Sequence, residues 1–185
     1  MSPKRYFENP YDDYDPTSAE TNFEFYSDEK AQQRITTLLR AIDQGKRSVC
    51  GQSDAGLYLG PAGVAYAFWR VHQSGITEGD PLSKARELLN YNLKYLKACN
   101  AEFDTKKDKL GFLIGQAGVF ATGAVIGRDG GDDALRDQCL AAFKDIAPLA
   151  VEGVNGSDEL LVGRAGYISG AIWLKQQFGT DVVPN

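Results

Sequence analysis

The stretch Leu59-Gly60-Pro61-Ala62-Gly63 decides the fold, because the sequence contains this pattern three times. It returns as Ile114-Gly115-Gln116-Ala117-Gly118 and as Val162-Gly163-Arg164-Ala165-Gly166. Each copy reads aliphatic-Gly-x-Ala-Gly and opens an apolar run. The copies follow one another at a period of about 50 residues, which is typical of proteins built from structural repeats. The sequence therefore predicts three copies of one supersecondary unit.

Two kinds of helix alternate around these motifs. Amphipathic helices are expected where apolar residues recur at three- and four-residue steps, at residues 28–44, 80–99 and from 132 or 133 onward. The second of these has Asp80 as N-cap and Pro81 at the first helical position. Apolar helices rich in small residues follow the glycine motifs and end near residues 73, 127 and 178.

This alternation predicts an all-α fold. Each amphipathic helix and the apolar helix after it would form a helical hairpin, at about residues 28–74, 80–127 and 132–178. In a concentric α/α arrangement the amphipathic helices form the outer layer and the apolar helices the inner one. Residues 1–27 are expected to form an irregular arm, and loops are expected at 45–58, 104–109 and 148–158.

The motif residues are assigned mainly structural roles. In each copy the first glycine permits a tight or left-handed turn into the helix, and the second clears space for a neighbour. Three helix N-termini around one axis could instead face an anion. Arg164 is expected to form a structural ion pair with a carboxylate, for example Asp54 or Glu159, or else to meet an anionic ligand. The positions assigned to the repeat motif are Gly60, Gly63, Gly115, Gly118, Gly163, Arg164 and Gly166.

Composition and charge exclude several functions. The net charge of −5 and the lack of a basic block argue against nucleic acid as a partner. No apolar stretch approaches the roughly 18 residues of a membrane span, and the N-terminus does not resemble a signal peptide. Three widely spaced cysteines argue for reduced thiols, so we expect a soluble cytoplasmic protein. His72 is the sole histidine and has no ligand at metal-binding spacing, so no metal site is predicted in this chain.

A resemblance to a known family rests on two stretches in addition to the glycine motifs. They are Phe7-Glu8-Asn9-Pro10-Tyr11-Asp12-Asp13-Tyr14 and Glu159-Leu160-Leu161-Val162-Gly163-Arg164-Ala165-Gly166-Tyr167-Ile168. Together they resemble the eukaryotic LanC-like proteins, relatives of the bacterial lanthionine-forming cyclases, over essentially the whole chain. The resemblance implies a double-layered α/α toroid of seven hairpins, of which this chain would supply three.

The resemblance also implies an activity for the whole protein. That activity is zinc-dependent addition of a thiol, with glutathione as the expected one, to dehydroamino acids in damaged proteins. The cysteine and histidine motifs that hold the family's zinc do not occur here, so the chain is expected to bind no zinc and to be inactive alone. Arg5 matches a position at which family members contact glutathione. The family also implies modified proteins as partners and occasional peripheral association with the plasma membrane.

Two alternatives from other classes remain open. An α/α-toroid enzyme that processes glycans would need a carboxylate pair, for which Asp54 and Glu159 are the candidates. A non-catalytic helical-repeat scaffold would bind proteins through exposed hairpins. The scaffold predicts a folded monomer without zinc. Part of a toroid of the LanC-like kind instead leaves apolar inner faces and open edges uncovered, so low stability or association is expected of it.

Overall fold

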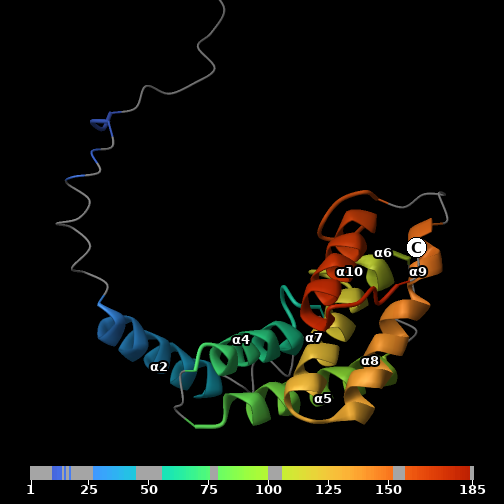
Figure 1. Cartoon of the computed structure of the whole chain (residues 1–185), viewed down its shortest axis with the longest axis horizontal. Coiled ribbons are helices and arrows are strands. Elements are labelled where there is room, and N and C mark those ends of the chain that lie inside the picture. Colours follow the sequence, from blue (N-terminus) through green and yellow to red (C-terminus); the bar gives the residue numbers. More distant parts are fainter. Residues whose placement is uncertain are drawn as a thin grey trace, which may run out of the picture. The chain divides into compact units, whose positions relative to one another are not determined.

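The computed structural model describes residues 10–13, 15, 17, 27–44, 56–75, 79–99, 106–151 and 157–183. Over these residues it contains helices and no strands, which confirms the all-α prediction (Figure 1). The chain divides into two compact units, residues 1–40 and residues 41–185. The two units are described separately below.

Helix α2 (Asp28–Gln44) contains most of the described residues of the first unit and ends just beyond its boundary. It begins at residue 28, as predicted. Ser27 caps this end, because its Oγ accepts from the backbone N–H of Lys30 at 3.3 Å. Asp28 and Glu29 add negative charge to the first turn, where the helix dipole favours it. No α2 side chain that the structure describes is buried. The predicted hairpin at 28–74 would cross the boundary between the units and stays a prediction.

In the second unit, the described residues form two short helices and five longer ones. They are α4 (Pro61–Gln73), α5 (Pro81–Ala98), α6 (Lys106–Leu110), α7 (Gln116–Asp129), α8 (Asp133–Asp145), α9 (Ala147–Val151) and α10 (Arg164–Phe178). The N-cap Asp80 is confirmed, since its carboxylate accepts from the backbone N–H of Ser83 at 2.9 Å. Of the two aspartates at which the third amphipathic helix could begin, Asp132 is the N-cap, and its carboxylate accepts from the backbone N–H of Leu135 at 3.0 Å. The hairpin boundaries at 80–127 and 132–178 stay predictions.

Two stretches predicted as loops are helical in part. The charged stretch at 104–109 contains most of α6, and the last residue of that helix, Leu110, is buried. Burial of one large apolar side chain outweighs the polar composition around it. The stretch at 148–158 begins inside α9, where Pro148 lies in the first turn, and proline is tolerated there because that N–H has no helical partner.

The helices of this unit form two layers. Helix α7 packs against α4 and α10, while α5 covers α4 and α7, and α8 covers α7 (Figure 1). Helix α7 is buried along most of its length, whereas α5 and α8 bury one face. The predicted layering, with apolar helices inside and amphipathic helices outside, is therefore confirmed for this unit, which has the architecture of part of an α/α toroid. None of the helices that the structure describes is long and apolar enough to cross a membrane.

Two glycines of α7 allow α8 to approach closely. A Cβ on Gly123 would lie 2.4 Å from Cys139 Sγ, and a Cβ on Gly127 would lie 2.6 Å from the backbone N of Arg136. The glycines are four residues apart and thus share one face of the helix. Small residues in this inner helix therefore bring the two layers together.

The far ends of the inner helices are joined by a polar network. Trp69 Nε1 on α4 donates to Asp129 Oδ2 on α7 at 2.7 Å, and Arg128 Nε donates to Asp129 Oδ1 at 2.7 Å. Arg128 also donates to the backbone O of Gln177 on α10, and its guanidinium lies 5.1 Å from the ring centroid of Phe178. Burial would raise the pKa of Asp129, but the hydrogen bonds from Arg128 and Trp69 outweigh it and hold that pKa below its ordinary value.

We predict that Cys139 resists thiol reagents in the folded protein. Its side chain is buried on α8, and burial raises the pKa of the thiol to about 12. Since the thiolate is the reactive form, a disulfide reagent at pH 8 should label the partly exposed Cys99 and leave Cys139 unmodified until denaturant is added. Mass spectrometry of the labelled peptides measures this. Equal labelling of both cysteines in native buffer would contradict the burial of Cys139.

We also predict that stability falls at alkaline pH. Burial raises the pKa of Cys139 and that of the Tyr167 hydroxyl each to about 12. Both folded-state pKa values lie above the unfolded ones, so the stability they contribute is complete below pH of about 8.5 and is lost as pH rises toward 12. Urea titrations from pH 8 to pH 11 should show a steady fall in the free energy of unfolding. The fall should be shallower in Cys139→Ala, and an identical slope would contradict this prediction.

Candidate functional site

The site begins at the turns that lead into the inner helices. Gly60, Gly115 and Gly163 are the N-caps of α4, α7 and α10, and all three have extended backbone with φ of −100°, −108° and −129°. A left-handed turn at the first glycine, which the sequence suggested, is therefore wrong. The tight turn is confirmed, since a Cβ on Gly163 would lie 1.9 Å from the carbonyl O of Ser157. Glycine is needed there for close approach and not for its torsion angles.

The second glycine of each motif also faces a backbone carbonyl. That carbonyl belongs in each copy to the residue six positions earlier, so the incoming loop folds back onto the first turn of its helix. The distances from an added Cβ to this oxygen are 1.9 Å for Gly63 and Leu57, 1.8 Å for Gly118 and Phe112, and 2.2 Å for Gly166 and Leu160. Any side chain at these positions would displace the loop.

The same glycines make room for the neighbouring repeat. Leu57 Cδ1 of the first loop would lie 2.7 Å from a Cβ on Gly118, and the backbone N of Phe112 in the second loop would lie 3.1 Å from a Cβ on Gly166. The Phe112 ring lies one turn further along α10, where it would be 2.7 Å from a Cβ on Gly170. This confirms the prediction that the second glycine clears space for a neighbour. Leu160, the equivalent residue of the third loop, is exposed.

Hydrogen bonds join the three loops in order. The N–H of Tyr58 donates to the carbonyl of Leu113 at 2.8 Å, and the N–H of Ile114 donates to the carbonyl of Leu161 at 3.3 Å. The loops are therefore fixed side by side, although about 50 residues separate them in the sequence. Together they form one rim at the N-terminal ends of the inner helices.

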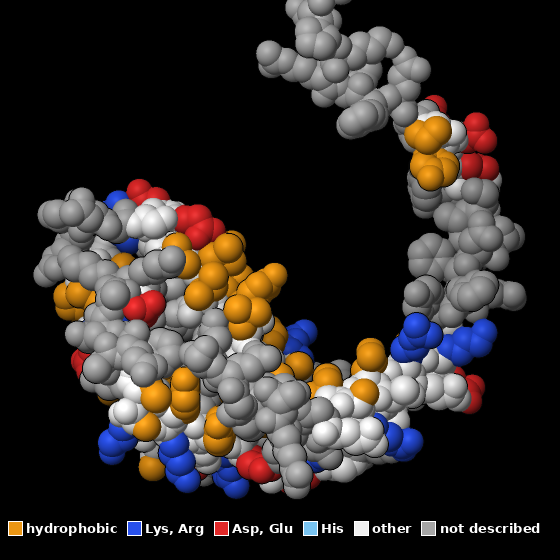
Figure 2. All heavy atoms as spheres, turned by 180° about the vertical axis from the view of Figure 1, so that it is seen from behind, with side chains coloured by type: hydrophobic (Ala, Val, Ile, Leu, Met, Phe, Trp, Pro, Cys, Tyr) orange, Lys and Arg blue, Asp and Glu red, His pale blue; other side chains and the backbone are white. Residues whose placement is uncertain are grey.

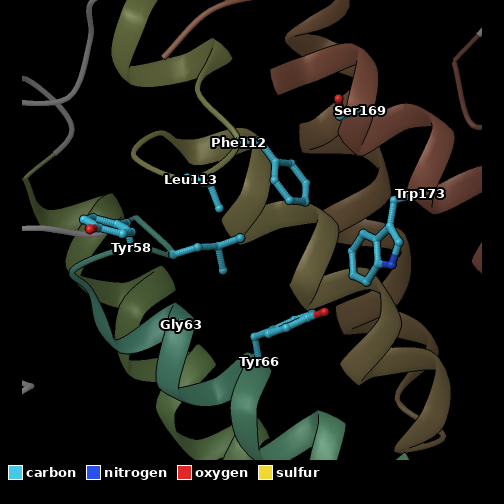
Figure 3. Close-up of a pocket in the computed structure, with 8 residues that line it drawn as sticks. Tyr58, Gly63, Tyr66, Phe112, Leu113, Ser169 and Trp173 are labelled. Carbon is cyan, nitrogen blue, oxygen red and sulfur yellow. The ribbon is translucent and has the colours of Figure 1, made fainter. Parts of the chain in front are cut away.

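A pocket of 460 Å³ opens beside this rim, between α4 and α10 (Figure 3). It is lined by Leu57, Tyr58, Gly63, Tyr66, Phe112, Leu113, Ser169 and Trp173. All three repeats contribute, but the aromatic rings come from α4, α10 and the first two loops. No residue in this lining is charged at neutral pH, and the polar atoms are limited to hydroxyls, the indole N–H and the backbone.

Trp173 holds the rings of the pocket together. Its ring centroid lies 6.1 Å from that of Tyr66, 6.1 Å from that of Phe112 and 5.8 Å from that of Trp69, in edge-to-face arrangements. Figure 3 shows Tyr66, Phe112 and Trp173 directed toward one another around the cavity. Such pairs contribute about 0.5–1.5 kcal/mol each beyond their burial, so the pocket wall is fixed in advance of any ligand.

The ion pair predicted for Arg164 exists, but with a different partner. Arg164 Nε contacts Asp158 Oδ1 at 2.5 Å, and this hydrogen bond lowers the pKa of the Asp158 carboxyl. Glu159 instead accepts from the backbone N–H groups of Leu161 at 3.0 Å and Val162 at 3.2 Å. The loop before α10 thus already holds a carboxylate, which argues against an anion at that helix end. Asp54 lies outside the described residues.

We predict a structural effect for Glu159. Replacing it by alanine removes the acceptor for two backbone N–H groups and should cost about 1 kcal/mol, as for the loss of a helix cap. Glu159→Gln keeps one side-chain oxygen as acceptor and should cost less. Urea titration measures both. If Glu159→Gln proved neutral for folding yet abolished glycan cleavage by the protein, the acid/base role would be correct instead.

No metal centre is present among the residues that the structure describes, where no three acidic, cysteine or histidine side chains come together. Cys139 is buried beside Gly123, Cys99 is partly exposed at the end of α5, and His72 is exposed at the end of α4. This donor set does not fit zinc. Arg5 lies outside the described residues, so its contact with glutathione stays a prediction.

A second cavity lies on the other side of α10. This groove of 780 Å³ is lined by residues of α8, α9, α10 and the segment after α10, among them Val151, Ile168, Ile172 and Val182. Ile168 and Ile172 are each 54% exposed, whereas Ala65 and Trp69, at the equivalent positions of α4, are buried. Figure 2 shows hydrophobic side chains among charged ones at the surface of this unit.

Sequence reasoning did not single out Tyr66, Phe112 and Trp173 as site residues. Each appears in the sequence as an ordinary apolar residue near a glycine motif. The available signal was that bulky aromatic side chains occur in, or just before, helices otherwise rich in alanine and glycine. That signal predicts that aromatic side chains fill the space between the inner helices, but it does not predict that a pocket remains there.

Comparison with known proteins agrees with this architecture. The family model "Lanthionine synthetase C-like protein" matches residues 51–184, which include all three glycine motifs. The chain is similar to "Glutathione S-transferase LANCL1" of Danio rerio, with 29% identity over 192 residues. That alignment covers 100% of this chain and 45% of the relative, so the chain spans about half the length of the curated relative it matches. The chain belongs to the lanthionine synthetase C-like family.

Proposed function

We propose that the whole protein adds a thiol, glutathione in the first instance, to dehydroamino acids in damaged proteins, and that this chain supplies part of the wall of the site. The observation that carries the proposal is the preformed aromatic pocket on the inner face of a chain of this family. The name of the Danio rerio relative, a glutathione S-transferase, supports glutathione as the thiol.

The proposed reaction is an addition to a carbon–carbon double bond. The thiol sulfur bonds to Cβ of the dehydroamino acid, and the proton is delivered to Cα, so no group leaves. The described residues that line the pocket include no carboxylate, imidazole or thiol, so we assign them to binding part of the substrate and to excluding water. In a fixed pocket that excludes water, the rate of addition rises because the acceptor is held in place.

The zinc ion that the resemblance implies would, when bound, stabilise a thiolate as a Lewis acid. We propose it for the whole protein only, because the described residues of this chain do not fit such a site. On the basis of the same resemblance, we propose that Arg5 contacts a carboxylate of glutathione. We also propose a cytoplasmic location and peripheral association with membranes.

The test compares two proteins on a dehydroalanine-containing peptide with glutathione. One protein is the 185-residue chain, and the other is a longer product that carries the family's cysteine and histidine motifs. Mass spectrometry follows formation of the thioether. We expect no acceleration by the 185-residue chain and clear acceleration by the longer product, lost on treatment with a zinc chelator. A longer, zinc-loaded product that fails to accelerate the addition would overturn the proposed function.

A second candidate is a non-catalytic module that binds proteins. The exposed groove on α10 favours it, because Ile168 and Ile172 leave apolar surface accessible there. This candidate requires the isolated chain to be folded in solution. A circular dichroism spectrum without helical signal would exclude it.

A further inference from the structure

We infer that the pocket between the first and third repeats receives one uncharged apolar side chain, aromatic or large aliphatic, of the protein substrate. This inference rests on the proposed function for the identity of the partner as a protein. It assigns the pocket to the substrate polypeptide and not to the thiol. The argument starts from the charge, shape and surroundings of the pocket.

The charge of the lining selects the occupant. The side chains around the pocket are four aromatic rings, two leucines, one serine and one glycine. Glutathione carries two carboxylates and an ammonium group, and burying these against apolar walls without partners would be costly. A neutral apolar side chain meets no such cost and gains by leaving water.

The shape of the pocket fits a side chain. Its volume of 460 Å³ falls in the lower half of the range of about 300–1,000 Å³ that is usual for ligand sites. Tyr66 and Trp173 meet at an interplanar angle of 63°, and Phe112 and Trp173 meet at 77°. Rings set at such angles can contact a further ring by face or edge.

The rim of the pocket continues the apolar surface outward. Tyr58, which lines the pocket, is 69% exposed, and Leu59 and Ile114 are 55% and 37% exposed. Leu59 and Ile114 are the aliphatic residues that open the first two glycine motifs, and the Tyr58–Leu113 hydrogen bond holds their loops together. A repeated motif therefore places apolar side chains at the surface beside an apolar cavity, which is the arrangement expected where a polypeptide docks.

Binding a side chain here would assist the proposed reaction without touching the reacting atoms. Binding energy from a remote group can hold the acceptor close to the thiol, which raises the rate of addition. Damaged proteins with an apolar residue near the dehydroamino acid would then be preferred over those with an acidic one.

Direct binding to the 185-residue chain tests the inference, with Trp173 as the fluorescent reporter. The probes are the capped tripeptides acetyl-Gly-Phe-Gly-amide and acetyl-Gly-Asp-Gly-amide. We expect the phenylalanine peptide to change tryptophan emission with a dissociation constant of about 1 mM, and the aspartate peptide to bind at least about tenfold more weakly. The change should be smaller in Trp173→Phe, which leaves Trp69 as the remaining tryptophan.

A matched pair of variants locates the binding. Ser169→Phe places a ring inside the pocket and should abolish binding of the phenylalanine peptide, measured by displacement from an immobilised copy of that peptide. Ile168→Phe adds the same ring to the neighbouring exposed position outside the pocket and should leave binding unchanged. Equal binding of both peptides, equal binding by both variants, or an emission change with phosphatidylcholine vesicles in place of peptide would each overturn the inference.

The outcome is distinguishable from that of the proposed function, because the binding test requires neither zinc nor thiol. A chain that binds the phenylalanine peptide, while the longer product adds no glutathione, would refute the proposed function alone. A longer product that adds glutathione, but equally well beside phenylalanine and aspartate, would refute the inference alone.

Discussion

Replacing Gly118 by alanine is expected to lower the free energy of unfolding of the second unit by about 3 kcal/mol or more. The new Cβ would lie 1.8 Å from the carbonyl O of Phe112 and 2.7 Å from Leu57 Cδ1. The first contact is with backbone, so no change of rotamer relieves it, and the loop that carries Phe112 must move. Overpacking of this kind costs about 3 kcal/mol or more when the neighbour cannot yield. Small domains are stable by only about 5–15 kcal/mol, so the loss is a large share of the total.

Urea titration followed by circular dichroism measures the effect. Gly75→Ala is the control, because its Cβ would meet nothing within 4 Å and the φ of +73° imposes only the left-handed strain of about 1–2 kcal/mol. Gly63→Ala and Gly166→Ala, which face the equivalent carbonyls, should resemble Gly118→Ala. Equal losses in Gly118→Ala and Gly75→Ala would show that the loop does not fold back onto the helix.

Replacing Trp69 by alanine is expected to lower the free energy of unfolding by about 3–5 kcal/mol. Trp69 is fully buried, its ring packs against Trp173, and its indole N–H donates to Asp129. The substitution leaves a large cavity and removes a hydrogen bond from a partly buried carboxylate. Both effects act where α4, α7 and α10 meet.

Ile172→Ala is the matched comparison, because Ile172 holds the equivalent position of α10 and is 54% exposed. This substitution should lower the free energy of unfolding by about 1 kcal/mol or less. Urea titration at two protein concentrations measures both variants. A large loss for Ile172→Ala that grows with protein concentration would show that association of the chain covers α10, contrary to the exposure found here.

The helical fold could be predicted because the local sequence signals agree with the fold as a whole. The period of the glycine motifs, the N-caps Asp80 and Asp132, and the ends of α4 and α10 all follow from sequence. The caps and the helix ends are decided by residues within one or two turns, where capping and periodicity act.

Features that depend on tertiary contacts could not be predicted. The partner of Arg164 is Asp158 because Glu159 is already held by two backbone N–H groups, a choice that spacing alone does not reveal. The motif glycines are needed because a Cβ there would overlap backbone carbonyl oxygens, and these oxygens come close only when the loop has folded. The pocket escaped prediction because it requires Tyr66 and Trp173, more than a hundred residues apart in sequence, to meet across the inner layer.

Amide hydrogen exchange tests the central claim most directly, namely that three distant loops form one continuous rim beside the pocket. The account predicts that the amides of Tyr58 and Ile114, which donate to the carbonyls of Leu113 and Leu161, exchange as slowly as those of α7 and open only with the unit as a whole. Exchange of both amides at the rate of an unstructured peptide, with α7 protected, would show that the loops are not joined and would contradict the account.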